Sequence, residues 1–302
     1  MAPKSPHTNE SLRNHFHLTY EVGKGSQIQP PCVTILEWTP KNVTPLFTLD
    51  LVGKGVCFDT GGHNLKTDAS SAKAMYGDKG GAIAQAQLFE LIAQANLPIK
   101  VRFGAGWVVN VPGGFATMQS DIFQVGEITI EDGNTDAEGR LVMGSILNYF
   151  AQHDPANITT TMATLTGAAL IGFGDYMAPM YAKTGPLAKV LQEGMQVAED
   201  PVWHMPRTKA ALKKLQGVGD ADLYSVGGSY GGSMTADAFL SQLAAKTTQF
   251  VHFDIACADT GTLGFTPGVT NMDMFAVRGA FEGLKLHIQQ IMDTTARSSS
   301  YN

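Results

Sequence analysis

Apolar positions recur along the chain with two periods, one typical of buried strands and one typical of helices. Continuous apolar runs predict single strands at residues 33–38, 99–105, 108–111, 158–165 and 250–255. A longer run at 46–58 predicts two strands, and an alternating pattern predicts a short strand at 127–130. Apolar residues at helical spacing predict helices at 80–95, 137–152, 186–198, 208–215 and within 272–294.

Strands that alternate with helices indicate an α/β fold, with a mixed, mostly parallel central sheet and helices on both of its faces. The alternation becomes regular only after the proline-containing stretch at 40–45. We therefore expect a short lead-in over 1–45, one main domain over 46–295 and a tail over 296–302. Glycines cluster at 53–62, 77–81, 104–114 and 227–232, which predicts loops that closely approach a ligand or one another.

Composition removes several classes of function. The formal net charge is −6 and no run of basic residues exceeds Lys213-Lys214, which argues against a nucleic-acid partner. No stretch reaches the ~18 apolar residues of a membrane span, and the polar start lacks the apolar part of a signal peptide. Cys32, Cys57 and Cys257 lie far apart without metal-ligand spacing, which favours a reducing, cytoplasmic location.

The first chemical motif is Asn134-Thr-Asp-Ala-Glu-Gly-Arg140, which follows a predicted strand. Carboxylates two positions apart on an extended segment, here Asp136 and Glu138, point to the same side and repel unless a cation lies between them. Arg140 offers the alternative explanation, a salt bridge at the end of a strand.

The second motif is the segment 53–62, in which Lys54 and Asp59 flank an apolar strand. A buried lysine needs a partner or a lowered pKa, and a neutral amine can bind a metal. Lys66 would bring a positive charge to the same site, or it is a solvated loop residue. Asp78, just before a predicted helix, either favours the helix N-terminus electrostatically or joins the site.

Together these segments supply carboxylates and lysines at strand ends, where ligands bind in open α/β sheets. Carboxylates suit hard or borderline cations, and two cations about 3.5–4 Å apart form the clamp of metal-assisted hydrolysis. No histidines have zinc-ligand spacing; His15 and His17 are interpreted as surface residues. The chain also lacks a nucleophile elbow, a phosphate-binding loop and a dinucleotide fingerprint.

Segments 51–62, 134–140 and 162–168 strongly resemble the leucyl aminopeptidase family, peptidase family M17. The resemblance covers roughly residues 30–285 and implies the fold of that family's catalytic domain over 46–295. It also implies a two-metal-dependent aminopeptidase that hydrolyses the N-terminal residue from peptides, with Leu- or Met-like residues preferred.

The resemblance further implies the metal ligands. Asp59 and Glu138 would bridge two divalent ions, Asp136 would complete the more exchangeable site, and Lys54 and Asp78 the tighter one. Zn²⁺ and Mn²⁺ are the expected metals, with Mg²⁺ or Co²⁺ as alternatives.

The other implied roles concern the substrate. Lys66 would polarise the scissile carbonyl, and Arg140 would hold a bicarbonate that acts as general base. The pocket for the first side chain would be lined by Met75, Thr164, Leu165 and Gly167. Family members form homo-oligomers, hexamers as a rule, so we expect a homo-oligomer here.

Several positions depart from the family pattern. The region before residue 46 is short, and the loop from Lys66 to Asp78 is one residue longer than usual, which could aim Asp78 away from the metal. Ser145 and Thr161 replace acidic residues, and His63 replaces an apolar one. These departures favour the alternative of a catalytically weak or inactive relative with a structural role. A phosphatase is disfavoured because only Lys66 and Arg140 could bind phosphate.

Overall fold

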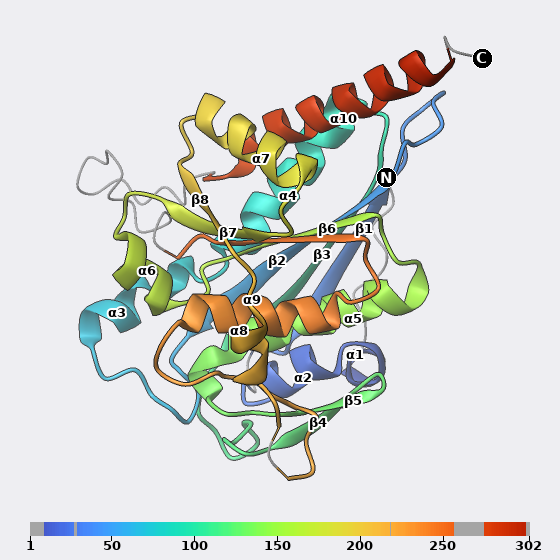
Figure 1. Cartoon of the computed structure of the whole chain (residues 1–302). Helices are drawn as coiled ribbons and strands as arrows, with labels where there is room; N and C mark the ends of the chain where they lie inside the picture. The colour runs from blue at the N-terminus through green and yellow to red at the C-terminus, as the bar shows by residue number, and fades with distance from the viewer. Residues whose placement is uncertain (1–8, 27–28, 218, 257–274, 300–302) are drawn as a thin grey trace.

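A seven-stranded sheet separates two layers of helices in the computed structural model, which describes residues 9–26, 29–217, 219–256 and 275–299 (Figure 1). In sheet order its strands are β1 (Cys32–Trp38), β3 (Lys100–Asn110), β2 (Thr48–Asp59), β6 (Ile158–Ala163), β10 (Gln249–Asp254), β7 (Ala178–Ala182) and β8 (Val202–Met205). The β1/β3 and β10/β7 pairs are antiparallel, and the other four pairs are parallel. The mixed, mostly parallel sheet expected from the sequence is confirmed.

Each face of the sheet has its own hydrophobic core. One core takes residues from α4 (Gly80–Gln94), α7 (Pro186–Val197) and α10 (Val277–Ser299). The other takes residues from α1 (Asn9–His15), α2 (His17–Gly23), α5 (Glu138–His153) and α9 (Gly232–Leu243), and α8 (Lys209–Lys213) lies beside α9 (Figure 1). Helices therefore cover both faces, as predicted. Among the helices of the described residues, none has the length and apolar character that crossing a membrane requires.

Two of the predicted strand boundaries are wrong. The run at 46–58 contains a single strand, β2, which begins at Thr48 and has a register shift between Val56 and Phe58, and the strands predicted at 99–105 and 108–111 are joined in β3. Both errors arise at glycines that the sequence pattern places in loops but that lie within strands. A Cβ on Gly53 would lie 2.3 Å from Cα of Ala82, and one on Gly104 would lie 2.4 Å from Cγ2 of Ile146. These glycines let α4 and α5 pack directly on the sheet.

The first part of the described chain is more ordered than its sequence pattern predicts. Helices α1 and α2 bury Leu12, Phe16, Leu18 and Val22 in the same core as α5, and β1 pairs with β3. The division of the chain at residue 45 stays a prediction. At the other end, α10 continues to Ser299, past the predicted end of the helix, and residues 272–274 lie outside the described part of the chain.

Several short elements were not predicted. They include α3 (Ala69–Ala74), a 3₁₀ turn, η1 (Met75–Gly77), and α6 (Gly167–Phe173). A second sheet consists of β4 (Ile122–Val125), β5 (Ile128–Glu131, near the predicted 127–130) and β9 (Leu223–Tyr224). Of these elements, α3 and η1 follow β2 and α6 follows β6. Residues of all three line the site described below.

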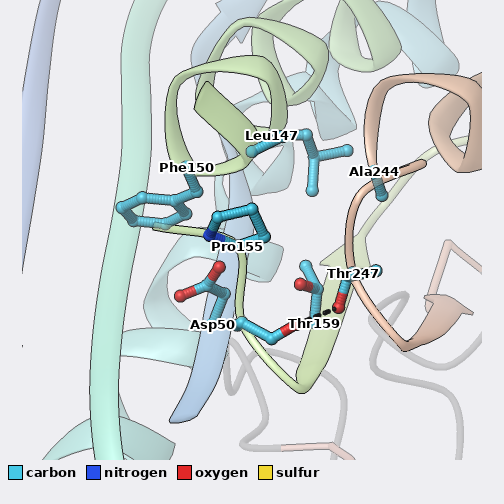
Figure 2. A pocket seen from close by; sticks show the side chains of 9 residues that line it. Asp50, Leu147, Phe150, Pro155, Thr159, Ala244 and Thr247 are labelled. Carbon is cyan, nitrogen blue, oxygen red and sulfur yellow. Dashed lines mark hydrogen bonds between the residues drawn. The ribbon is translucent and has the colours of Figure 1, made fainter. Parts of the chain in front are cut away.

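A buried ion pair joins Asp50, near the amino end of β2, to Arg102 in β3. Arg102 Nε lies 2.6 Å from Asp50 Oδ1, and its second nitrogen lies 2.8 Å from Asp50 Oδ2. The guanidinium also donates to the carbonyl of Asp154 (2.6 Å) and lies 4.6 Å from the ring centroid of Phe150. Burial raises the pKa of Asp50 to about 6, although Arg102 opposes the shift. Figure 2 shows Asp50 at the wall of a small pocket, beside Pro155.

We expect Asp50→Ala to lower the free energy of unfolding by about 3–5 kcal/mol, because it leaves the Arg102 guanidinium buried without its partner. Urea denaturation would measure the loss as a lower midpoint. The double variant Asp50→Ala/Arg102→Met should recover most of it, since both charges are then gone. Equal midpoints for the single and double variants would contradict this account.

Candidate metal centre and substrate pocket

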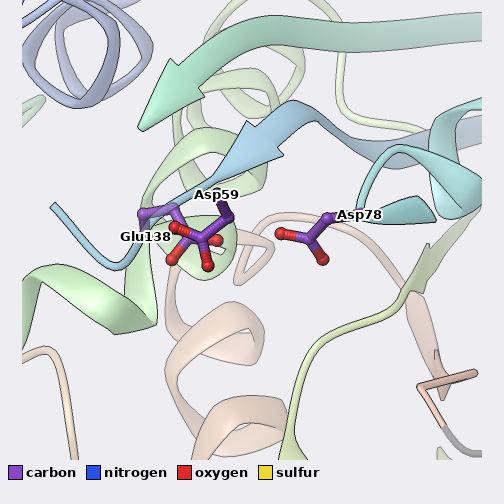
Figure 3. A group of neighbouring side chains, drawn as sticks. All are labelled: Asp59, Asp78 and Glu138. Carbon is purple, nitrogen blue, oxygen red and sulfur yellow. The ribbon is translucent and has the colours of Figure 1, made fainter. Parts of the chain in front are cut away.

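Three carboxylates meet beyond the carboxyl end of β2. Asp59 is the last residue of that strand, Asp78 lies between η1 and α4, and Glu138 begins α5. All three side chains are buried, and one oxygen of each lies within 4.8 Å of the others. Figure 3 shows Asp59 and Glu138 side by side, with Asp78 facing them. Three negative charges so close together in a buried site repel one another strongly unless cations compensate them.

The turn after β2 fixes Asp59. Its Oδ1 accepts hydrogen bonds from the N–H of Gly61 (2.8 Å) and from Nδ2 of Asn110 (2.7 Å). Gly61 and Gly62 have φ values of +91° and +61°, which favour glycine. Asn110, at the end of β3, also donates to the carbonyl of Thr135 (2.8 Å), and Thr135 Oγ1 donates to the carbonyl of Gly61 (2.8 Å). The two motifs found in the sequence are thus hydrogen-bonded together.

Lys54 lies between two of the carboxylates. Its Nζ is 2.6 Å from Asp78 Oδ1, 3.0 Å from Glu138 Oε1 and 3.0 Å from the carbonyl oxygen of Thr164. Burial alone would lower the pKa of Lys54, but the charges of Asp78 and Glu138 outweigh it and raise the pKa. The neutral amine considered from the sequence would therefore require a cation that displaces the proton.

Lys66 makes the corresponding contacts on the other side. It forms ion pairs with Asp59 (2.9 Å) and with Asp136, and its side chain is only 15% exposed. Burial lowers its pKa, but the charge of Asp59 and the hydrogen bond to Asp136 raise it above its ordinary value. This geometry is not that of a solvated loop lysine. Asp136 itself stands at the edge of the carboxylate group, 31% exposed.

Arg140 is buried, as Lys54 is. One terminal nitrogen of Arg140 donates to the carbonyl of Ser225 (2.9 Å), and Nε has no hydrogen-bond partner among the described residues. Burial lowers the pKa of Arg140 to about 10, although Glu138 opposes this. The salt bridge that offered an alternative explanation of the motif is replaced by other pairs, because Asp136 pairs with Lys66 and Glu138 with Lys54.

Two carboxylate oxygens of the group are not satisfied by the lysines and could bind a cation. Asp78 Oδ2 and Glu138 Oε2 are buried without hydrogen-bond partners among the described residues, which is costly for a carboxylate. Burial raises the pKa of Asp78 to about 8; Lys54 opposes the shift, and Glu138 adds to it. Carboxylate oxygens with one amine nitrogen form a donor set for borderline divalent ions. The residues present therefore fit divalent metal ions.

A cavity of about 660 Å³ opens beside this group. Lys54, Asp59, Lys66, Asp78 and Asp136 line one part of it. All four predicted substrate-binding residues, Met75, Thr164, Leu165 and Gly167, line another, together with the unpredicted Tyr76, Leu170 and Ala256. These predicted residues thus share one cavity, whereas Glu138 and Arg140 are not among the residues that line it.

The unusual positions noted in the sequence have simple places in the structure. The longer loop folds as α3 and η1, and Asp78 still reaches Lys54 and accepts a hydrogen bond from Thr164 Oγ1 (2.9 Å). Thr161 Oγ1 is bonded to His252 Nδ1 (2.8 Å), Ser145 Oγ accepts from the N–H of Thr19 (3.4 Å), and His63 is exposed.

Comparison with known proteins agrees with this geometry. A model of the cytosol aminopeptidase family, catalytic domain, matches residues 4–278. The chain belongs to this family. A cytosol aminopeptidase of Encephalitozoon cuniculi is 36% identical over 246 residues, 81% of this chain and 50% of the relative. A probable cytosol aminopeptidase of Chlorobaculum tepidum is 34% identical over 267 residues, 87% of this chain and 52% of the relative. The chain spans about half the length of these curated relatives.

Solved structures show the same fold. The cytosol aminopeptidase from Coxiella burnetii superposes with a TM-score of 0.84 at 30% identity, covering 94% of this chain and 61% of that one. The bottromycin maturation enzyme BotP in complex with Mn gives a TM-score of 0.85 at 27% identity, covering 94% and 62%. The resemblance to peptidase family M17 inferred from the sequence motifs is thereby confirmed.

The contact between Lys54 and helix α5 gives a test of the site's packing. A Cβ on Gly139 would lie 2.4 Å from Cε of Lys54, so Gly139→Ala should displace the lysine and destabilise the fold by about 1–3 kcal/mol in urea denaturation. Gly172→Ala in α6 is the matched control, since a Cβ there meets no atom within 4 Å. Equal stability of the two variants would show that Lys54 yields without cost.

Proposed function

We propose that this protein is a two-metal aminopeptidase that removes the N-terminal residue from peptides and prefers Leu- or Met-like residues. The observation that carries the proposal is the group of buried carboxylates, Asp59, Asp78 and Glu138, whose oxygens are only partly satisfied beside an open cavity. Membership of the cytosol aminopeptidase family supports it.

In this proposal the metal ligands are divided between two sites. Asp59 and Glu138 would bridge both ions, Lys54 and Asp78 would complete the tighter site, and the more exposed Asp136 would complete the exchangeable one. Zn²⁺ or Mn²⁺ would serve; a solved relative in complex with Mn supports manganese. When bound, two such ions supply Lewis acidity and a nucleophilic water near neutral pH.

The lysines and the arginine would act on the substrate side. Lys66, already at the cavity wall, would turn its ammonium toward the scissile carbonyl and stabilise the negative charge that develops there. Arg140 would hold a bicarbonate general base, and its buried Nε without a partner is a donor that this role needs. The α-amine of the substrate would lie near the carboxylates.

The cavity walls support the proposed preference. Met75 and Leu165 offer apolar surface, Leu170 and Ala256 extend it, and Gly167 leaves space for a side chain. The relatives' name supports a cytoplasmic location as part of the same proposal. The homo-oligomer expected from the resemblance stays a prediction.

Release of leucine from Leu-amide, with Mn²⁺ or Zn²⁺ added, tests the proposed activity. Glu138→Ala should lower kcat/KM by more than about 100-fold, since changes in outer-shell partners alone cost about 10–100-fold. Glu193→Ala is the control, because Glu193 is exposed on α7 and its ion pair is with Lys189 on the same helix. A chain that releases no leucine with any of these metals, and carries no metal by elemental analysis, would refute the proposal.

Gly167 tests the preference for large apolar residues. A side chain at this position would project into open space at the cavity wall. Gly167→Val should therefore lower kcat/KM for Leu-amide by about 10-fold or more relative to Ala-amide, since one or two methylenes in a pocket decide discrimination of that size. Parallel assays of the two amides measure the ratio. An unchanged ratio would place the side-chain pocket elsewhere.

A further inference from the structure

The segment 164–167, called the 164–167 loop below, joins β6 to α6 and includes Gly167, the first residue of α6. It borders both the carboxylate group and the cavity. The carbonyl of Thr164 accepts from Lys54 Nζ at 3.0 Å, and its hydroxyl donates to Asp78 Oδ1 at 2.9 Å. Every residue of this loop lines the cavity. Its backbone position therefore sets both the arrangement of Lys54 with Asp78 and the shape of the pocket wall.

The side chain of Asp254 accepts hydrogen bonds from this loop. Asp254 is the last residue of β10 and pairs in parallel register with Ala163, the residue just before the loop. Its side chain is fully buried and is not among the residues that line the cavity. One carboxylate oxygen accepts from the N–H groups of Leu165 (3.2 Å) and Thr166 (3.3 Å).

The second oxygen of Asp254 extends the network to two hydroxyls. It accepts from Thr166 Oγ1 (2.7 Å) and from Ser233 Oγ at the start of α9 (2.7 Å). Thr166 also caps α6 by accepting from the N–H of Ala169 (3.2 Å). The N–H of Ala256 also lies 3.5 Å from the first oxygen. Five hydrogen bonds from the described residues thus converge on one carboxylate, three of them from the loop.

This arrangement suits an ionised carboxylate, because each oxygen faces hydrogen-bond donors. An ionised aspartate accepts at both oxygens, whereas an asparagine amide has one acceptor and one donor group. A buried charge is costly unless hydrogen bonds satisfy it, and these hydrogen bonds do so here. The position of the loop is therefore tied to the chemical identity of residue 254.

We propose that Asp254 is a positioning residue that fixes the 164–167 loop, and through Thr164 the geometry of Lys54 and Asp78, for metal and substrate binding. This inference rests on the proposed aminopeptidase function. Asp254 touches neither metal nor substrate in this role. It acts through the hydrogen bonds that it accepts from the loop.

The test compares Asp254→Asn with Ser233→Ala. The asparagine keeps the size of the side chain but places an NH₂ group toward Thr166 Oγ1 and Ser233 Oγ. Ser233→Ala removes the hydrogen bond from Ser233 Oγ to Asp254, which is as long as the bond from Thr166 Oγ1 to the same oxygen but comes from α9 instead of the loop. Titration of Mn²⁺ into the metal-free chain measures metal affinity, and Leu-amide kinetics separate KM from kcat.

We expect Asp254→Asn to weaken Mn²⁺ binding by about 10-fold and to raise KM for Leu-amide, as changes to outer-shell partners of metal ligands do. Ser233→Ala should keep both values near those of the wild type, with a similar thermal midpoint for the two variants. A folded Asp254→Asn variant with wild-type Mn²⁺ affinity and KM overturns the inference.

If Asp254→Asn does not fold, Thr166→Val and Thr166→Ser replace it. Valine removes the hydroxyl that donates to Asp254, whereas serine keeps it, so only valine should weaken Mn²⁺ binding. Equal Mn²⁺ affinity of the two variants overturns the inference. A wild-type chain that neither binds Mn²⁺ nor cleaves Leu-amide refutes the proposed function itself, a result distinct from any difference between variants.

Discussion

Repulsion among Asp59, Asp78 and Glu138 is the constraint around which the site is organised. Two unit charges about 5 Å apart repel by about 3 kcal/mol at an effective dielectric constant near 20, and one oxygen of each residue lies within 4.8 Å of the others. Lys54 and Lys66 offset this charge in the metal-free chain. Among the described residues, Asp78 Oδ2 and Glu138 Oε2 are still buried without hydrogen-bond partners, which suits the group to cations better than a closed salt-bridge network would.

Bringing these carboxylates together depends on close packing of helices against the sheet. Gly53 in β2 and Gly81 in α4 let the helix approach both β2 and β6, since a Cβ on Gly81 would lie 2.1 Å from the carbonyl oxygen of Met162. Asp78 lies two residues before α4, so this approach carries it to Lys54. Gly139 similarly lets α5 pass beside the stem of Lys54. Small residues within the elements, rather than loops, thus set the distances in the site.

The sequence motifs identify the charged residues of the site, but not the residues and short elements that hold them in place. Asp59 ends β2 of the central sheet, whereas Asp136 and Glu138 follow β5 of the second sheet. The specific motifs name these residues, but hydrogen bonds of Asn110 and Thr135 join the two segments, not a shared sheet edge. The strand boundaries within β2 and β3 were predicted wrongly, because in the sequence a glycine required for close packing cannot be distinguished from one in a turn. Asn110 and Asp254 carry no local signal, since their partners are far away in the sequence. Short elements such as α3 and α6 hold too few residues to show a period.

The two ends of β2 show why the positive partners at the site are lysines. At the amino end, the planar guanidinium of Arg102 satisfies both oxygens of Asp50 and cannot release its proton, so that pair is closed to other cations. At the carboxyl end, Lys54 and Lys66 are point charges on flexible stems. In the proposed function an ammonium would turn aside or lose a proton on metal binding, and Lys54 would then serve as a ligand. Arginine at either position would fill the site that the carboxylates need to keep available.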